Sequence, residues 1–129
     1  MNIPTDLKYA KTDEWIRVDG ATATIGVTDF AQSELSDVVY VELPAVGDSF
    51  TAGQSFGSVE SVKAASEIYM PVAGTITAVN TELTTRPELI NQDPYGNGWI
   101  VKINITDDSN LANLLDADAY RAHCEARKH

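Results

Sequence analysis

Lys63 is the residue whose type and position in this sequence best suit chemistry. Residues 55–60 and 67–72 are two apolar stretches that converge on residues 61–64 (S-V-K-A), which predicts a β-hairpin with the lysine at or near its tip. An amine in that position can be reached by another enzyme. The pattern is weak by itself, because most hairpin lysines only keep a sheet edge soluble.

Other residues that could do chemistry are few. The chain has two histidines, and His123 stands beside the single cysteine, Cys124. Neighbouring helical residues point in different directions, so this pair is a poor chelate and helix packing is favoured. Gly96 and Gly98 precede a predicted strand instead of opening a helix, which is the wrong context for phosphate binding. The sequence therefore predicts no catalytic residue and no metal site.

The elements that position Lys63 are predicted to be mainly strands. Short runs rich in β-branched and aromatic residues, bounded by Gly, Pro, Asp or Asn, recur along the chain as far as residue 105. Besides the two hairpin strands, they cover residues 23–27, 38–43, 74–79 and 99–105. Closely spaced short strands suggest a small barrel or sandwich.

Three helices are predicted between and after these strands. Thr28 can cap a short helix over residues 29–35. Pro87 can open a second short helix over residues 87–90, since proline suits the first helical position. A C-terminal helix at about residues 116–127 has Asp116 as its N-cap and an apolar face. We expect that helix to pack onto the sheets.

Length and charge narrow the function classes. The 129 residues predict a single domain with one core. The formal charge of −10 argues against a nucleic-acid or anionic-membrane partner, because both require clustered Lys and Arg. An acidic body suits basic protein partners, although it also serves solubility alone.

The compartment is predicted to be the cytoplasm. No apolar run approaches the roughly 20 residues that cross a bilayer, and the first residues match neither a secretory nor a transit signal. One cysteine excludes an internal disulfide. We expect a monomer.

The segments around Lys63 resemble an attachment domain. V-G-D (46–48), E-S-V-K-A (60–64) and P-V-A-G-T-I (71–76) are similar to lipoyl and biotinyl domains, in which a tip lysine accepts the cofactor as an amide. The resemblance implies a small barrel-sandwich hybrid with short helices and a C-terminal helix. Biotin carriers place Met on both sides of the lysine, whereas Val62 and Ala64 stand here. Lipoate is therefore favoured.

Further segments resemble the glycine cleavage H-protein family in order along the chain. They are L-K-Y-A (7–10), D-E-W (13–15), I-G-V-T-D-F-A-Q (25–32), V-V-Y-V-E-L-P (38–44) and N-Q-D-P-Y-G-N-G-W (91–99). The family commonly has glycine where this chain has Ser36. The exit of the first helix is therefore expected to need a different backbone geometry.

The resemblance implies a non-catalytic carrier with lipoate on Lys63. Its partners would be a pyridoxal-phosphate glycine decarboxylase, an aminomethyltransferase, dihydrolipoyl dehydrogenase, and a lipoate ligase or lipoyl/octanoyl transferase. The carrier would move an aminomethyl group from the first enzyme to the second before its arm is reoxidised. The loaded arm is implied to lie in a cleft at Thr12, Glu14 and Glu67, and ordinary surface polarity is the alternative for these three residues.

Three other interpretations stay open. The chain could be a lipoyl depot that donates lipoyl groups to other complexes, and this shares Lys63 with the carrier interpretation. It could be an unmodified scaffold, although the E-S-V-K-A turn weighs against this. A biotin carrier subunit is disfavoured by the neighbours of the lysine.

Overall fold

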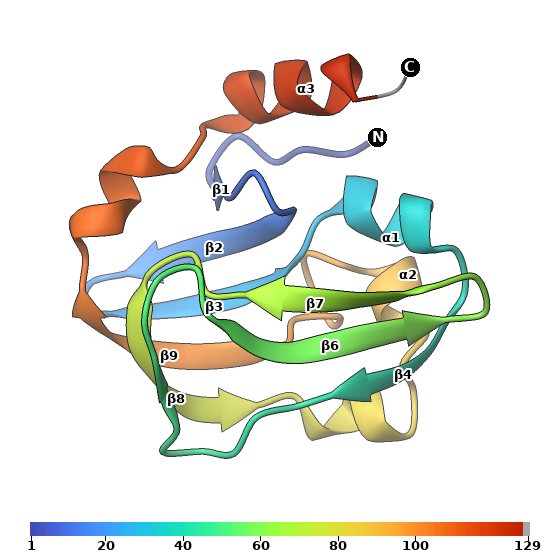
Figure 1. Ribbon diagram of the computed structural model, residues 1–129, viewed down its shortest axis with the longest axis horizontal. Helices are drawn as coiled ribbons and strands as arrows, with labels where there is room; N and C mark the ends of the chain where they lie inside the picture. Colours follow the sequence, from blue (N-terminus) through green and yellow to red (C-terminus); the bar gives the residue numbers. More distant parts are fainter. Residues whose placement is uncertain (128–129) are drawn as a thin grey trace.

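Nine strands in two antiparallel sheets form the body of the computed structural model, which describes residues 1–127 (Figure 1). The strands are β1 (Lys8–Tyr9), β2 (Glu14–Asp19), β3 (Thr22–Val27), β4 (Val38–Glu42), β5 (Ser49–Phe50), β6 (Ser55–Ser61), β7 (Ala65–Tyr69), β8 (Ala73–Val79) and β9 (Val101–Asp107). The larger sheet has the order β1-β2-β3-β9-β8-β5, and the smaller has the order β4-β6-β7. The predicted mainly β class is confirmed.

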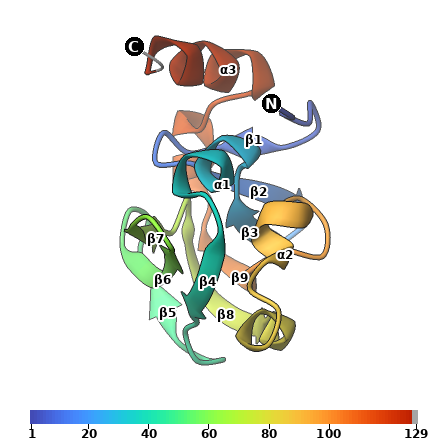
Figure 2. The ribbon, with the colours of Figure 1, turned by 90° about the vertical axis from the view of Figure 1, so that its right-hand side faces the viewer.

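The main core lies between the two sheets. Ile25 and Ile103 of the larger sheet are buried in one cluster with Val41, Val59 and Ile68 of the smaller sheet. Alternate side chains of a strand point to opposite faces, so each sheet turns one apolar row inward. Figure 2 shows β6 and β7 of the smaller sheet on one side and β2, β3 and β9 of the larger sheet on the other.

The helices are α1 (Asp29–Leu35), α2 (Leu89–Gln92) and α3 (Ala117–Ala126), with 3-10 turns at Thr81–Thr84 and Ser109–Asn113. Both predicted caps are confirmed. The Thr28 hydroxyl accepts a hydrogen bond from the Ala31 amide (3.1 Å), and the Asp116 carboxylate accepts one from the Ala119 amide (2.8 Å). No helix within residues 1–127 is both long and apolar enough to span a membrane.

Several predicted boundaries are wrong by two or three residues. The strand expected at 67–72 is β7, which begins at Ala65 because it pairs as soon as the turn closes, with Ala65 opposite Glu60. The strand expected at 99–105 is β9, at 101–107. The helix expected at 87–90 is α2, which begins at Leu89 because the preceding residues form a turn in which the Leu89 amide bonds to the Arg86 carbonyl.

Three strands were not predicted from the sequence: β1, β2 and β5. Strands β1 and β5 have only two residues each. Strand β2 lacks the apolar–polar alternation of a half-buried strand because both of its faces are covered: Ile16 is buried in the main core and Trp15, its neighbour, in a second cluster.

The second cluster joins the two ends of the chain. It contains Ile3, Leu7, Tyr9, Trp15, Phe30, Ala117, Tyr120 and Cys124. The rings of Tyr9 and Tyr120 stack with their centroids 4.7 Å apart. Figure 1 shows α3 lying across the N-terminal segment, beyond β1 at the edge of the larger sheet. The C-terminal helix therefore packs onto the sheet through β1 and β2.

Ser36 ends α1 with φ 68° and ψ −153°. Only glycine reaches this region without strain, and other residues there cost about 1–3 kcal/mol. The side chain of Asn91 holds the turn: it donates to the Ser36 carbonyl (2.8 Å) and accepts from the Val38 amide (2.9 Å). The serine therefore adopts a conformation that is typical of glycine.

Candidate functional site

The hairpin of β6 and β7 places Lys63 in a three-residue turn at its tip. The hydroxyl of Ser61 accepts hydrogen bonds from the amides of Lys63 (3.2 Å) and Ala64 (3.0 Å) and donates to the Ala64 carbonyl (3.0 Å). The Val62 amide donates to the Asp37 carbonyl (3.0 Å), which ties the tip to the segment before β4. The short Ser61 side chain therefore holds the backbone of the tip in one conformation.

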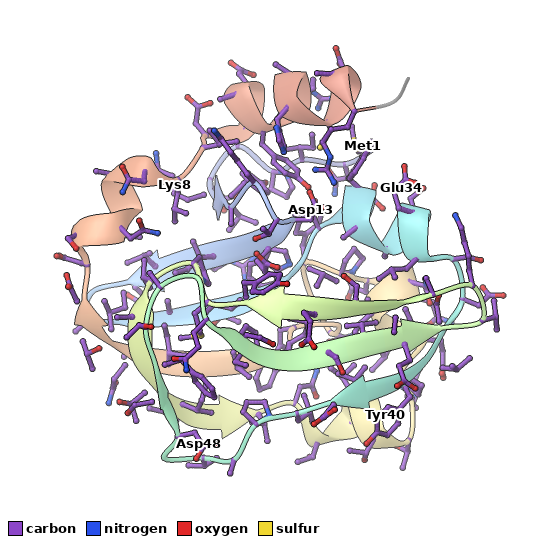
Figure 3. The ribbon with its side chains drawn as sticks, viewed as in Figure 1. Met1, Lys8, Asp13, Glu34, Tyr40 and Asp48 are labelled. Carbon is purple, nitrogen blue, oxygen red and sulfur yellow. The ribbon has the colours of Figure 1, made fainter. Side chains whose placement is uncertain are left out.

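The amine of Lys63 lies at the C-terminal end of α1. Its Nζ donates to the backbone carbonyl of Glu34 at 3.0 Å, and Figure 3 labels Glu34 on α1, beside the hairpin. The last carbonyls of a helix have no partner within it, and the helix dipole places negative charge there. The amine of an unmodified lysine is therefore stabilised at this end of the helix. After acylation, the N–H of the amide that forms at Nζ is still a hydrogen-bond donor.

A cleft of about 140 Å³ has Glu34 in its lining, together with all three predicted cleft residues. It is lined by Thr12, Asp13, Glu14, Val27, Ala31, Glu34, Leu35, Val59, Ser66, Glu67, Ile68 and Arg127. The lining comes from the loop before β2, from α1, from the hairpin strands and from the end of α3. The structure thus brings Thr12, Glu14 and Glu67 together, while their role stays a prediction.

Glu14 is the buried acid of this cleft, with 1% of its surface exposed. One carboxyl oxygen bonds to the Thr12 hydroxyl and the other to the Tyr69 amide (3.2 Å). Burial raises the pKa of Glu14 to about 8, although both hydrogen bonds oppose the shift. Glu14 is therefore mostly protonated at pH 7. Ordinary surface polarity does not describe it, whereas Thr12 and Glu67 are exposed.

A hydrogen-bond chain holds the residue that precedes Glu14. Tyr120 donates to the Asp13 carboxylate (2.8 Å) and lies 2.6 Å from the Thr28 hydroxyl, which caps α1. Arg127 forms a bidentate pair with Asp13, at 2.7 and 2.8 Å. Asp13 has φ 82°, a left-handed conformation that aspartate tolerates better than most residues. The C-terminal helix thereby fixes the loop that carries Glu14.

The lining fits an aliphatic chain that ends in a cation. Val27, Ala31, Leu35 and Ile68 provide apolar walls. The ionisable residues of the lining are Asp13, Glu14, Glu34, Glu67 and Arg127, and Arg127 is already paired with Asp13. The remaining carboxyl groups favour a positive charge inside the cleft.

Sequence reasoning did not identify Glu34, Asp13 or Arg127. Glu34 contributes its backbone carbonyl, which no residue type signals. Asp13 and Arg127 are 114 positions apart, and only the packing of α3 reveals the pair. Within residues 1–127 no three His, Cys, Asp or Glu side chains group as a metal site; the His123 ring nitrogen lies 3.1 Å from the Lys11 carbonyl instead.

Comparison with known proteins agrees with this geometry. The family model described as "Glycine cleavage H-protein" matches residues 7–127. The chain is 52% identical over 124 residues to the probable glycine cleavage system H protein of Haloarcula marismortui, covering 96% of this chain and 98% of that protein. It is 54% identical over 121 residues to the H protein of Symbiobacterium thermophilum, covering 94% of each.

A solved structure gives the same result. The crystal structure of a glycine cleavage system H protein from Mycobacterium marinum matches with a TM-score of 0.85 and 38% identity, covering 93% of this chain and 97% of that chain. This match confirms the barrel-sandwich prediction. H proteins are non-catalytic carrier subunits, which confirms that the chain is not an enzyme. The chain belongs to the glycine cleavage H-protein family.

Proposed function

We propose that the chain is a single-domain, monomeric, cytoplasmic lipoyl carrier of the glycine cleavage system, with the lipoyl group attached as an amide to Lys63. It would carry an aminomethyl group from glycine decarboxylase to the aminomethyltransferase, and dihydrolipoyl dehydrogenase would then reoxidise its arm. The observation that carries this proposal is the position of the Lys63 amine, 3.0 Å from the carbonyl of Glu34 at the edge of the cleft.

The protein and the cofactor divide the work. When bound, lipoate supplies the thiol–disulfide chemistry and the carrying atom. The chain supplies a rigid attachment point, because the Ser61 hydroxyl bonds the backbone of the turn on both sides of Lys63. Tethering to a docked body raises the concentration of the reactive end at each partner's active site. No side chain of the carrier has to catalyse a step.

The cleft is proposed to shield the loaded end of the arm. Its apolar walls exclude water, and the carboxyl groups of Glu14 and Glu67 attract a protonated amine. Glu14 is mostly neutral in the empty cleft because burial raises its pKa to about 8. A cation beside it favours the ionised form, so we expect Glu14 to lose its proton when the amine enters.

The attachment is tested by intact mass after incubation with lipoate, ATP and a lipoate ligase, with peptide mapping of the modified residue. We expect one lipoyl group on Lys63 and none on Lys63→Ala. A carrier that stays unmodified, or is modified at another residue, would contradict the proposal. A lipoyl/octanoyl transferase with its own acyl donor serves as the second test enzyme.

The shielding role is tested by the lifetime of the loaded carrier. Replacing Glu14 by Gln keeps the size of the side chain but removes the negative charge, so we expect faster loss of the aminomethyl group. The matched control is Glu42→Gln, an exposed carboxylate outside the cleft. Equal lifetimes for wild type and Glu14→Gln would rule out this role.

A further inference from the structure

Three exposed apolar side chains stand near Lys63, and we call them the tip patch: Val39, Tyr40 and Val62. Their exposed fractions are 53%, 53% and 69%. Within the described residues only three other large apolar side chains are comparably exposed, namely Met1, Val18 and Val46. Half of the exposed apolar side chains therefore gather beside the attachment lysine.

A β-bulge in β4 creates this exposure. Val38 pairs with Ser61 and Tyr40 with Glu60, so Val39 is an extra residue without a partner across the ladder. Val38 and Val41 are buried, while the two residues between them both point to solvent. A bulge re-aims side chains in this way, and it places Tyr40 on the same face as its cross-strand partner Glu60.

The patch is not needed by the core. Val38 and Val41 already provide the apolar contacts of β4 with the main core. Strand β4 is the edge of the smaller sheet, and proteins usually protect such edges with charge instead of leaving valine and tyrosine exposed there. An apolar group kept at a sheet edge is typical of a contact surface.

Acidic residues surround the patch. Asp37, Glu42 and Glu60 adjoin it and are exposed. Lys63 is the only cation between Arg17 and Arg86, so the strands of the smaller sheet carry no other positive charge. A complementary partner has an apolar centre and a rim of Lys or Arg.

The short reach of the lysine side chain indicates which partner binds the tip patch. The side chain of an unmodified lysine extends only about 6 Å from its Cα, being five bonds long. Tyr40 is opposite Glu60, three residues before Lys63, which places the patch within about 10 Å of the lysine at the usual rise of a strand. An enzyme that acts on the bare amine must cover this surface, whereas an enzyme that acts on the far end of a long arm can bind elsewhere.

We propose that the tip patch is the docking surface for the enzyme that acylates Lys63, a partner with an apolar contact ringed by basic residues. This inference rests on the proposed function. In the acylation, the deprotonated amine attacks a lipoyl adenylate formed from lipoate and ATP. The amide C–N bond forms, the acyl–phosphate bond breaks, and AMP and one proton leave.

The test compares acylation rates of the full chain with a lipoate ligase, lipoate and ATP, followed by intact mass. Val39→Ser/Tyr40→Ser removes two patch side chains that are more than half exposed, so folding should be retained, as thermal unfolding will verify. We expect kcat/KM to fall about tenfold, mainly through KM. Val46→Ser, 61% exposed and outside the patch, is the matched control and should change less than about twofold.

Two further measurements separate the possible outcomes. Glu60→Lys should also lower kcat/KM, and raised salt should lower the wild-type value. Once fully lipoylated, the double variant should be reoxidised by dihydrolipoyl dehydrogenase at the wild-type rate. Wild-type acylation kinetics for the double variant, or an equal loss with the dehydrogenase, would overturn the inference. A wild type that is not acylated at Lys63 would instead contradict the proposed function.

Discussion

The attachment end, which is the turn that holds Lys63, and the far end, which is the part of the cleft around Glu14, are built in opposite ways. At the attachment end, one hydroxyl holds Lys63 through bonds within residues 61–64. At the far end, Glu14 depends on Tyr69 and on a network that reaches Tyr120 and Arg127. The attachment end is local in the sequence, while the far end exists only when the two chain ends pack together. Attachment and shielding are therefore separable properties.

The two ends also differ in solvation. Lys63 is exposed and bonds to a helix carbonyl. Glu14 is buried and its pKa is raised to about 8. Substitutions at the far end should therefore change stability and its pH dependence, while substitutions at the attachment end should change the rate of modification.

Tyr120→Ala should break the far end most severely. It leaves a cavity in the second cluster beside Tyr9 and removes the hydroxyl from Asp13 and Thr28. We expect the free energy of unfolding to fall by about 3–5 kcal/mol, measured by urea unfolding. Tyr120→Phe keeps the stacked ring, so its free energy of unfolding should fall much less. The acylation of Lys63 in the folded fraction should be unchanged; a parallel loss would show that the two ends are coupled.

Glu14→Gln should remove a pH dependence of stability that arises at the far end. Because folding raises the pKa of Glu14 from 4.5 to about 8, the folded state binds more protons than the unfolded state between these values. The free energy of unfolding of the wild type should therefore fall as the pH rises through this window, by a few kcal/mol, and the variant should show less of this fall. Urea unfolding at pH 5.5, 7 and 8.5 measures it, and parallel profiles would contradict the assignment to Glu14.

Ser61→Ala should affect the attachment end alone. It removes the hydroxyl that fixes the turn, so the lysine should sample more orientations and the rate of acylation should fall several-fold. The cost in stability should be about 1 kcal/mol. Ser61→Thr keeps the hydroxyl and should restore the rate. An unchanged rate of acylation in Ser61→Ala would mean that the attachment turn does not have to be rigid.

Ser36→Gly should have the smallest effect, and a favourable one. Strain of about 1 kcal/mol is relieved at φ 68°, and roughly half of this is offset by the greater freedom of glycine in the unfolded chain. We expect a net gain of about 0.5 kcal/mol, seen as a slightly higher Tm. Ser33→Gly, at a helical position of α1, is the control and should destabilise. Destabilisation by Ser36→Gly itself would show that the serine is not strained.

Much of the fold was predictable because its signals are local. The hairpin, the cap at Thr28 and the cap at Asp116 are all patterns within a few residues, and each is confirmed. Strand β2 was not predicted because two different clusters cover its faces, which removes the periodicity. Boundaries shifted where pairing or a turn decided them, as at Ala65 and Leu89.

The amino-acid sequence by itself determined the family, the mainly β class and the lysine at a hairpin tip, because these depend on residue types at short spacing. Only the tertiary structure decided that Glu14 is buried, that Arg127 holds Asp13, and that the carbonyl of Glu34 receives the lysine. Burial and long-range pairing depend on how distant segments pack. The raised pKa of Glu14 follows mainly from the burial that this packing produces.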